Sequence, residues 1–315
     1  INGFGRIGRN TFKILFGQED VEIVAINDLT DAKTLAHLLK YDSSYGTYNR
    51  QVTFDNENLS IDGRLIRLYS ESDPVSLPWA EHNIDVVIES TGFFTDPEKA
   101  RAHITAGAKK VIISAPLKGV GAKTIVLGVN DQDLTPEDDI ISNASCTTNC
   151  IAPVMKVLED YFGIEKAMMT TAHSYTSSQR ILDAPSRDLR AARSAAVSII
   201  PGTTGASKAT ALVIPSLENK FAGLSFRVPT PVVSISHITA VLKRPTTKEE
   251  LNNTFKQAAS EANYQGILSV SEEPLVSTDY KGSPYSSIVD LELTDVVGGD
   301  LVKVVAWYDN EWGYS

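Results

Sequence analysis

Two cysteines mark the segment of this chain that is best suited to covalent chemistry. The stretch "SNASCTTNC" holds both cysteines of the 315-residue sequence, Cys146 and Cys150, four residues apart. Such a pair can ligate a metal, form a redox couple or supply one reactive thiol. The five histidines, at positions 37, 82, 103, 173 and 237, are scattered, whereas a zinc site needs ligands at close spacing. We therefore expect no metal and favour a single reactive thiol.

The residues after Cys146 indicate which thiol reacts. Apolar side chains fall on one helical stripe at Ile151, Val154, Met155, Leu158 and Phe162. This pattern predicts a helix that begins at or just after Cys146, where the helix dipole and free N–H groups favour a thiolate. Cys150 lies one turn deeper, on the apolar side, where a cysteine behaves as a small hydrophobic residue. We predict that Cys146 is the nucleophile.

A cysteine nucleophile needs a base, and the stretch "MMTTAHSYT" supplies His173 at the end of a probable strand. A histidine in such a place is more often structural when taken alone. An imidazolium beside the thiolate would lower the pKa of Cys146, and the same imidazole could relay a proton to or from a substrate oxygen. We predict that His173 is the base.

The N-terminal segment "INGFGRIGRN" carries a second pattern with a chemical meaning. Gly3, Gly5 and Gly8 form G-x-G-x-x-G, and an apolar stretch that ends at Asp28 follows after a helix-length gap. Glycines of this kind permit a tight strand-to-helix turn that brings backbone N–H groups to a pyrophosphate. Asp28, placed 20 residues after Gly8, can bind an adenosine ribose and repel a 2′-phosphate. The pattern predicts NAD rather than NADP, and a glycine turn beside an unrelated carboxylate is the less favoured explanation of this stretch alone.

The elements around these residues predict two domains. Residues 1–144 contain short Val- and Ile-rich runs separated by helix-like segments, which is typical of a doubly wound parallel sheet, the Rossmann-type NAD domain. We expect its strands at 21–28, 83–90, 108–115, 124–129 and 139–144, with a helix at 96–107. Residues 145–315 show alternation, clearest at 231–244, and predict an α+β catalytic domain with a largely antiparallel sheet.

Composition narrows the class of protein. The chain has 29 Lys and Arg against 39 Asp and Glu, a formal charge of −10, so nucleic acid is not expected as its primary partner. Two cysteines, no cationic leader and no membrane-length apolar run favour a cytoplasmic protein.

Six segments together identify a family. "INGFGRIGR", "SNASCTTNC", "HSYT", "IIPGTTGA", "FRVPTP" and "WYDNEWGYS" occur in this order. With them the chain closely resembles phosphorylating glyceraldehyde-3-phosphate dehydrogenase, nearly from end to end. The resemblance implies that the Cys146 thiolate adds to the aldehyde, a hydride passes from the thiohemiacetal to NAD, and inorganic phosphate cleaves the thioester to give 1,3-bisphosphoglycerate.

The resemblance also implies a set of binding residues. Arg227 is expected to serve two anion pockets, one for the substrate phosphate with Thr176 and one for the attacking phosphate with Ser145, Thr147, Thr204 and Gly205. The expected coenzyme-binding residues are Gly3, Gly5, Arg6, Ile7, Gly8, Asp28, Ser114, Asn310 and Tyr314. Among them, Asn310 matches the residue whose amide orients the nicotinamide, and Tyr314 lies beside it.

Residues 177–201 resemble the family's loop that packs between subunits of a homotetramer near a neighbour's coenzyme pocket. Many NAD-specific relatives have Leu where this chain has Ala184, so some use of NADP stays open. Family members continue past the residue that matches Ser315 with a helix, and only Ile1 and Asn2 precede the glycine turn. We therefore expect that the first strand and the C-terminal helix of the NAD domain are trimmed.

Three other functions remain as alternatives. Erythrose-4-phosphate dehydrogenase is the nearest, but its relatives usually alter the "TTGA" segment, which is intact here. A non-catalytic NAD-binding scaffold is disfavoured by intact Cys146, His173 and Arg227. A cysteine hydrolase leaves the glycine pattern and Asp28 unexplained.

Overall fold

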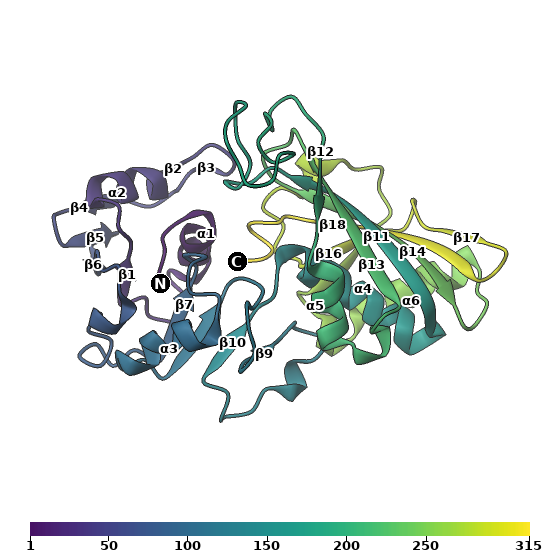
Figure 1. Ribbon diagram of the computed structural model, residues 1–315, viewed down its shortest axis with the longest axis horizontal. Coiled ribbons are helices and arrows are strands. Elements are labelled where there is room, and N and C mark those ends of the chain that lie inside the picture. The colour runs from purple at the N-terminus through teal and green to yellow at the C-terminus, as the bar shows by residue number, and fades with distance from the viewer. The chain divides into compact units, whose positions relative to one another are not determined.

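The structure, a computed structural model, describes all 315 residues and divides them into two compact units (Figure 1). The first unit comprises Ile1–Thr124, Leu134–Ala144 and Ser315, and the second comprises Ile125–Asp133 and Ser145–Tyr314.

The first unit is built on two sets of four strands, and a single residue connects the two sets. The strand orders are β1-β6-β5-β4 and β7-β8-β10-β9, and Asn2 bridges in parallel to Asn27 of β1 and to Glu89 of β7. Its helices are α1 (Arg6–Leu15), α2 (Ala32–Lys40), η1 (Pro74–Ser76) and α3 (Pro97–Thr105). Its strands are β1 (Ala25–Asn27), β2 (Tyr41–Asp42), β3 (Gly46–Thr47), β4 (Val52–Phe54), β5 (Asn58–Ile61), β6 (Arg64–Tyr69), β7 (Val86–Glu89), β8 (Lys110–Ile113), β9 (Lys123–Thr124) and β10 (Ile140–Ser142).

The parallel strands confirm the predicted doubly wound class. β7, β8, β9 and β10 pair in parallel, and so do β1 and β6. Apolar residues of these strands, such as Val87, Val111 and Ile140, are buried against α3 and Trp79. The antiparallel meander β4–β5–β6 was not expected, and it packs Leu59 and Ile61 onto α1 and α2.

One predicted strand is mostly absent. We expected a strand at 124–129, but β9 ends at Thr124 and a turn follows. The turn forms because the Asn130 side chain accepts a hydrogen bond from the Val126 N–H at 2.9 Å, and Gly128 adopts a φ of +75°. A Cβ at Gly128 would lie 2.9 Å from the Asn263 carbonyl, so the turn packs tightly within the second unit.

The second unit contains one large mixed sheet. Its order is β12-β13-β11-β14-β18-β16-β15, with β17 paired to β18. Its helices are η2 (Asp131–Asp133), α4 (Cys146–Phe162), α5 (Ala206–Val213), η3 (Pro215–Leu217), α6 (Lys248–Ser260), η4 (Ala262–Tyr264) and η5 (Ser277–Tyr280). Its strands are β11 (Ile164–Ser174), β12 (Ile200–Thr203), β13 (Phe221–Val228), β14 (Ser234–Leu242), β15 (Leu268–Ser271), β16 (Ser287–Asp290), β17 (Asp295–Val297) and β18 (Leu301–Tyr308). Only the β11–β13 and β15–β16 pairs are parallel, which confirms the largely antiparallel prediction.

Alternation along the central strands separates two faces of this sheet. Ile238, Ala240 and Leu242 of β14 are buried, and α4 packs against β14, β16 and β18. Met168 on the neighbouring strand β11 is 71% exposed.

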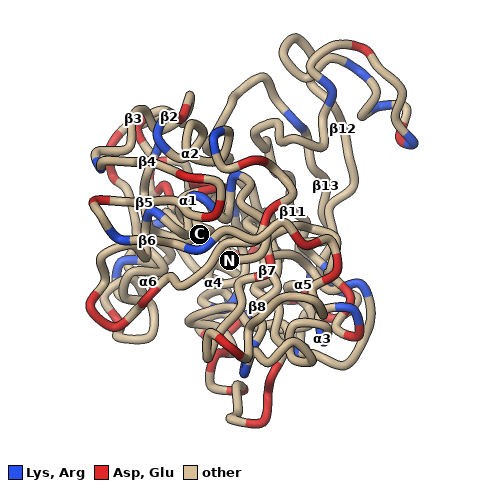
Figure 2. The backbone as a smooth tube through the Cα atoms, turned by 90° about the vertical axis from the view of Figure 1, so that its left-hand side faces the viewer, with Lys and Arg blue, Asp and Glu red and all other residues tan.

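Acidic and basic residues are interspersed along the whole chain (Figure 2). No helix of the structure is both long and apolar enough to cross a membrane.

Candidate active site

The glycine turn has the geometry that a dinucleotide requires. Gly3 has a φ of +87°, and a Cβ there would lie 2.6 Å from the Thr91 nitrogen. A Cβ on Gly8 would lie 2.1 Å from the Gly3 carbonyl, so helix α1 can approach the turn only with glycine at that position. Gly5, the N-cap of α1, has open space around its Cβ position and provides no side-chain cap, and the first turn carries no acid. The residues present therefore fit a pyrophosphate at the start of α1.

Asp28 lies beside this turn, directly after β1. Its Oδ2 accepts a hydrogen bond from the Phe4 N–H at 2.7 Å, and its Oδ1 accepts one from the Thr30 N–H at 2.9 Å. Each carboxylate oxygen has a further lone pair, so the group can still accept hydrogen bonds from a ribose. The backbone contacts fix the carboxylate in place for that purpose.

The structure places the remaining predicted coenzyme residues of this unit as follows. The Arg6 guanidinium lies 2.7 Å from Asp42 Oδ2, and it helps to hold the pKa of Asp42 below its usual range, against burial, which raises it. Ile7 lies in the first turn of α1. Ser114 follows β8 and donates its N–H to the Glu89 carbonyl at 2.9 Å. Asp42 was not recognised from the sequence, because nothing in its neighbourhood signals a contact with a residue 36 positions earlier.

A buried network of polar side chains lies next to the glycine turn and holds the residues around it in place. Glu89 is 2% exposed; one of its oxygens accepts hydrogen bonds from the Thr91 N–H and hydroxyl, and the other contacts Asn2 Nδ2 and His103 Nε2. The Trp79 indole N–H donates to His103 Nδ1 at 3.0 Å, so the ring's proton must be on Nε2. This network fixes the position of Thr91, which lines a pocket together with the glycine turn.

A pocket of about 540 Å³ lies next to this network, and Asn2 and Thr91 belong to both. Its lining brings together the glycine turn, the end of β1 and the segments that follow β6 and β7. The residues are Asn2, Gly3, Gly5, Asn27, Asp28, Leu29, Glu71, Ser72, Ser90, Thr91, Phe93 and Phe94. The glycine turn and Asp28, both predicted to bind the coenzyme, therefore line one pocket.

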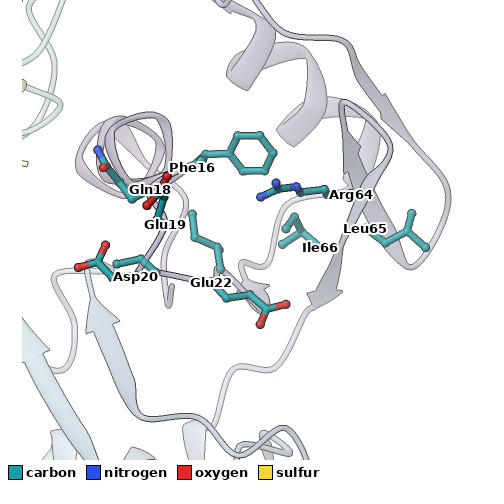
Figure 3. A pocket seen from close by; sticks show the side chains of 11 residues that line it. Phe16, Gln18, Glu19, Asp20, Glu22, Arg64, Leu65 and Ile66 are labelled. Carbon is teal, nitrogen blue, oxygen red and sulfur yellow. The ribbon is translucent and has the colours of Figure 1, made fainter.

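Another pocket, of about 580 Å³, lies elsewhere in the first unit, between the end of α1, the loop into β1 and strand β6 (Figure 3). Phe16, Glu19, Asp20 and Arg64 are among its lining residues. It contains none of the predicted site residues.

Cys146 occupies the first position of α4, as predicted. Ser145 is the N-cap, and its hydroxyl accepts a hydrogen bond from the Thr148 N–H at 3.1 Å. Burial raises the pKa of the Cys146 thiol, and the positive charge of Arg227 partly offsets that effect. Cys150 is fully buried near Ser287, and burial raises its pKa to about 12. The two sulfur atoms therefore differ in their surroundings, because a nearby cation partly offsets the effect of burial at Cys146 and no cation does so at Cys150.

His173 lies against Cys146 at the end of β11. Its Nε2 is 3.4 Å from the Cys146 Sγ, and its Nδ1 is 2.7 Å from Arg227 Nη1 and 2.7 Å from the Ser174 carbonyl oxygen. β11 and β13 pair in parallel with His173 opposite Arg227, which places the two side chains side by side. Burial and the adjacent guanidinium lower the pKa of His173 to about 3. A ring with so low a pKa is neutral at neutral pH, which differs from the imidazolium that we expected beside the thiolate.

The other predicted anion-binding residues are less closely grouped. Thr176 bonds to Gln179 and Ser178 in a local turn, and Thr204 caps Ala206 at the start of α5, where Gly205 is the N-cap. Neither threonine is hydrogen-bonded to Arg227. Arg227 forms no ion pair within the chain, and its pKa is lowered by burial. It is a half-buried cation that an anion can neutralise.

Asn310 and Tyr314 belong to the second unit with Cys146. The Asn310 carbonyl oxygen accepts a hydrogen bond from the Ser234 hydroxyl at 3.2 Å and lies 3.2 Å from the Ser174 hydroxyl. Its amide nitrogen has no partner within the chain, so this end is available to a ligand. Burial raises the pKa of the half-buried Tyr314, and so does the nearby Cys146.

A chain of hydroxyl groups under the site was missed from the sequence. The Tyr308 hydroxyl lies 3.0 Å from the hydroxyls of Thr147 and Thr171, and Thr171 donates to the Ile235 carbonyl at 3.1 Å. Because the single proton of Thr171 goes to Ile235, Tyr308 must donate to Thr171, and Thr147 must donate to Tyr308. The only signal in the sequence was the alternation of apolar and polar residues along β18, which indicates that Tyr308 is buried.

The sheet, the glycine turn and Asp28 define an NAD-binding dehydrogenase whose second unit carries a cysteine. Two family models match the chain: the glyceraldehyde 3-phosphate dehydrogenase NAD binding domain over residues 1–97, and the C-terminal domain of the same enzyme over residues 145–310. The chain belongs to the glyceraldehyde-3-phosphate dehydrogenase family, and it is an NAD-dependent oxidoreductase.

Individual relatives agree with this assignment. The chain is 56% identical over 316 residues to "Glyceraldehyde-3-phosphate dehydrogenase" of Geobacillus stearothermophilus, covering 100% of the chain and 94% of the relative. The protein of the same name from Borreliella burgdorferi is 54% identical over 321 residues, with 100% and 95% covered. "Glyceraldehyde-3-phosphate dehydrogenase GAPB, chloroplastic" of Arabidopsis thaliana is 54% identical over 320 residues, with 100% and 71% covered.

Proposed function

We propose that this protein oxidises glyceraldehyde 3-phosphate to 1,3-bisphosphoglycerate with NAD and inorganic phosphate. The observation that carries the proposal is the trio of Cys146, His173 and Arg227, which places a thiol at a helix N-terminus, a titratable ring and an unpaired cation in contact. We assign residues 1–144 to the coenzyme domain and 145–315 to the catalytic domain.

The catalytic residues divide the chemistry among them. Cys146 Sγ adds to the aldehyde carbon, and the helix N-terminus and Arg227 stabilise the negative charge on sulfur. His173 Nε2, at 3.4 Å from Sγ, is placed to take and return the proton that moves between sulfur, ring and substrate oxygen. Bound NAD supplies the acceptor for the hydride. Asn310, held through its carbonyl oxygen by Ser234, offers its amide N–H groups to orient the coenzyme.

Phosphate recognition rests on Arg227. Its guanidinium supplies the charge for an oxyanion, and we assign Thr176 to the substrate phosphate and Ser145, Thr147, Thr204 and Gly205 to the attacking phosphate. In the structure the Thr147 proton is directed at Tyr308. Thr147 can donate to a phosphate if its hydroxyl turns from Tyr308 towards the anion, and Tyr308 then keeps its own bond to Thr171.

The assembly that we propose is a homotetramer acting in the cytoplasm. Exposed apolar side chains gather on the segment before β12, where Ile181, Leu182, Leu189, Val197 and Ile199 are each more than two-thirds exposed. Met168 adds apolar surface on the open face of the sheet. Burying such surface favours association. Sedimentation velocity checks the tetramer, and a protein that stays monomeric at micromolar concentration contradicts it.

The experiment that tests the function is NADH formation from glyceraldehyde 3-phosphate with and without phosphate or arsenate. A rate that depends on neither anion removes the phosphorylating assignment. The same assay with NADP measures the effect of Ala184. Arg227→Leu should lose about 10- to 150-fold in binding of the phosphorylated substrate, because the lost charge-assisted contact is worth roughly 1.5 to 3 kcal/mol, and lose less with unphosphorylated glyceraldehyde.

A further inference from the structure

The pocket of about 540 Å³ in the first unit has two walls that come from different sets of strands. Asp28 and Glu71 follow β1 and β6 of one set, and Ser90 and Thr91 follow β7 of the other. The backbone of Asn2 lies between β1 and β7 and bridges to both (Figure 1). The position of one wall relative to the other therefore depends on the few groups that connect the two sets.

A continuous series of side-chain hydrogen bonds connects the walls. Asn27 Nδ2 donates to the Glu71 carbonyl oxygen at 2.9 Å and to Asn2 Oδ1 at 2.7 Å, and Asn27 Oδ1 accepts from the Glu71 N–H at 2.8 Å. Asn2 Nδ2 donates to Glu89 Oε2 at 2.5 Å. Glu89 Oε1 accepts from the N–H and the hydroxyl of Thr91. Three buried side chains thus link the segment after β6 to Thr91.

Glu89 is the member of this series that a residue of the same shape cannot replace. A carboxylate has four lone-pair positions and no proton to donate. Thr91 supplies two donors to Oε1, while Asn2 and His103 supply one each to Oε2, so all four positions are filled. The His103 proton is fixed on Nε2, because Nδ1 accepts from the Trp79 indole. Every group around Glu89 is therefore a donor.

The bonds between Glu89 and Thr91 also hold the next part of the wall. The Thr91 hydroxyl gives its single proton to Glu89 and accepts a hydrogen bond from the Phe93 N–H at 3.1 Å. Gly92, between the two, has a φ of +77°, so the backbone turns there. Phe93 is 81% exposed and lines the pocket together with Phe94. Loss of the contact with Glu89 would release the turn that carries both phenylalanines.

We propose that Glu89 is a positioning residue for NAD. By accepting hydrogen bonds from both walls, it holds them at the separation at which the coenzyme binds beside Asp28. Glu89 is 2% exposed, so it acts through Thr91 and Asn2 and does not touch the coenzyme itself. The proposal rests on the proposed function in taking NAD as the ligand of this pocket.

The size of the effect follows from the fraction of molecules whose pocket has the binding geometry. When only part of a population can bind, the apparent Kd rises by the inverse of that fraction. Glu89→Gln keeps the size of the side chain but replaces one acceptor oxygen by an NH₂ group, which then faces two donors. We expect the Kd for NAD to rise about tenfold. That factor corresponds to about 1.4 kcal/mol, near the lower end of the range for one hydrogen bond to a charged group.

The test is isothermal titration calorimetry of NAD with the wild type, Glu89→Gln and a matched control, Asp290→Asn. Asp290 is a carboxylate of the second unit that is 3% exposed and accepts a hydrogen bond from the Trp307 indole at 3.1 Å. Both substitutions replace a buried carboxylate by an amide of the same shape and should lower Tm. Only Glu89→Gln should raise the Kd. An unchanged Kd in Glu89→Gln overturns the proposal, and so does an equal rise in Asp290→Asn.

Steady-state kinetics provide a readout that a loss of stability alone would not move. Cys146 and His173, to which we assign the chemistry, belong to the second unit. Glu89→Gln should therefore raise KM for NAD about tenfold and leave kcat at saturating NAD within about twofold of the wild type. A lower kcat with an unchanged KM would show that the substitution merely reduces the amount of folded protein.

A second substitution separates the polarity of the Asn2–Glu89 contact from its size. Asn2→Asp alone places two carboxylates in contact and should weaken NAD binding. In the double variant Asn2→Asp/Glu89→Gln, the carboxylate at position 2 can accept from the amide at position 89 and from Asn27. The Kd should then be lower than in either single variant, although the N–H of His103 still lacks an acceptor. Additive losses in the double variant contradict the proposed contact.

Thr91→Val is the variant to use should Glu89→Gln not fold. It removes the hydroxyl whose proton Glu89 accepts and keeps the shape of the side chain. The Kd for NAD should rise in this variant too, and an unchanged value counts against the proposal in the same way.

The two proposals fail separately. Phosphate-dependent NADH formation by the wild type, together with an unchanged Kd in Glu89→Gln, removes the positioning role and keeps the proposed function. If Glu89→Gln weakens NAD binding but the wild type forms no NADH from glyceraldehyde 3-phosphate, the positioning role stands and the proposed function does not.

Discussion

Replacing Tyr308 by phenylalanine removes the middle of the hydroxyl chain beneath the active site. The side chain is 1% exposed, and its hydroxyl contacts Thr147 and Thr171 at 3.0 Å each. In Tyr308→Phe the Thr147 proton loses its acceptor, and Thr171 loses the hydrogen bond that it accepts. The ring and its packing stay. The substitution therefore isolates the contribution of the hydroxyl.

The size of the effect follows from the two partners left behind. A buried polar group without a partner costs about 1 to 3 kcal/mol, and Thr171 keeps its bond to Ile235, so we expect a loss near 2 kcal/mol. For a unit of this size 1 kcal/mol corresponds to roughly 2 to 4 °C in Tm, which gives a drop of about 4 to 8 °C. Phosphate affinity should also fall, because Thr147 no longer has a fixed orientation.

The assay is thermal unfolding followed by circular dichroism, with Tyr280→Phe as the matched control. Tyr280 is also buried in the second unit, its ring stacks on Trp307 at 5.2 Å, and its hydroxyl has no hydrogen-bond partner. Removing that hydroxyl should leave Tm unchanged or raise it. If Tyr308→Phe and Tyr280→Phe unfold at the same temperature, the hydroxyl chain contributes nothing and the reasoning is refuted.

Three further predictions concern the thiols, the ring and the glycine turn. Cys146→Ser should abolish NADH formation with an unchanged Kd for NAD, whereas Cys150→Ala should remain active; substantial turnover of the first variant contradicts the assignment of the nucleophile. The pKa of His173 is about 3 in the folded protein and about 6.5 in the unfolded chain. Between these values the unfolded chain binds a proton that the folded protein does not bind, so the free energy of unfolding falls as the pH drops from 6.5 towards 3. His173→Gln should therefore flatten that dependence by up to about 1.4 kcal/mol per pH unit, and equal slopes in urea titrations of both proteins would show that the ring titrates normally. Gly8→Ala should lower both Tm and NAD affinity, since its Cβ would lie 2.1 Å from a backbone carbonyl, while Gly5→Ala, with open space around it, should lower NAD affinity alone; a stable Gly8→Ala protein that binds NAD normally refutes the steric argument.

The sequence predicted those features that depend on neighbouring residues. The start of α4 followed from the stripe of apolar residues after Cys146, and the glycine turn followed from the spacing of its glycines together with the apolar run that ends at Asp28. The parallel strands were recognised because buried strands are continuously apolar. The meander β4–β5–β6 was missed because its strands are short and half-exposed, so they have little apolar signal.

Contacts between segments that are far apart in the sequence could not be predicted from local patterns. The pairing of β11 with β13 brings His173 to Arg227, 54 residues later, and no local pattern encodes that register. Burial and, after it, the charge of Arg227 lower the pKa of His173, and neither cause can be seen in the sequence. Tyr308 lies 137 residues from Thr171, and no local pattern predicted their contact either.

The network beneath the coenzyme pocket also gives the protein an optical probe. The chain has three tryptophans, and Trp79 is the only one in the first unit, since Trp307 and Trp312 belong to the second. Trp79 is buried, and its indole N–H is bonded through His103 to Glu89, which holds Thr91 at the pocket wall. Indole emission responds to the loss of such a bond and to exposure to water. In a protein with phenylalanine at positions 307 and 312, the fluorescence of Trp79 would follow the unfolding of the coenzyme-binding unit separately from that of the unit that carries Cys146.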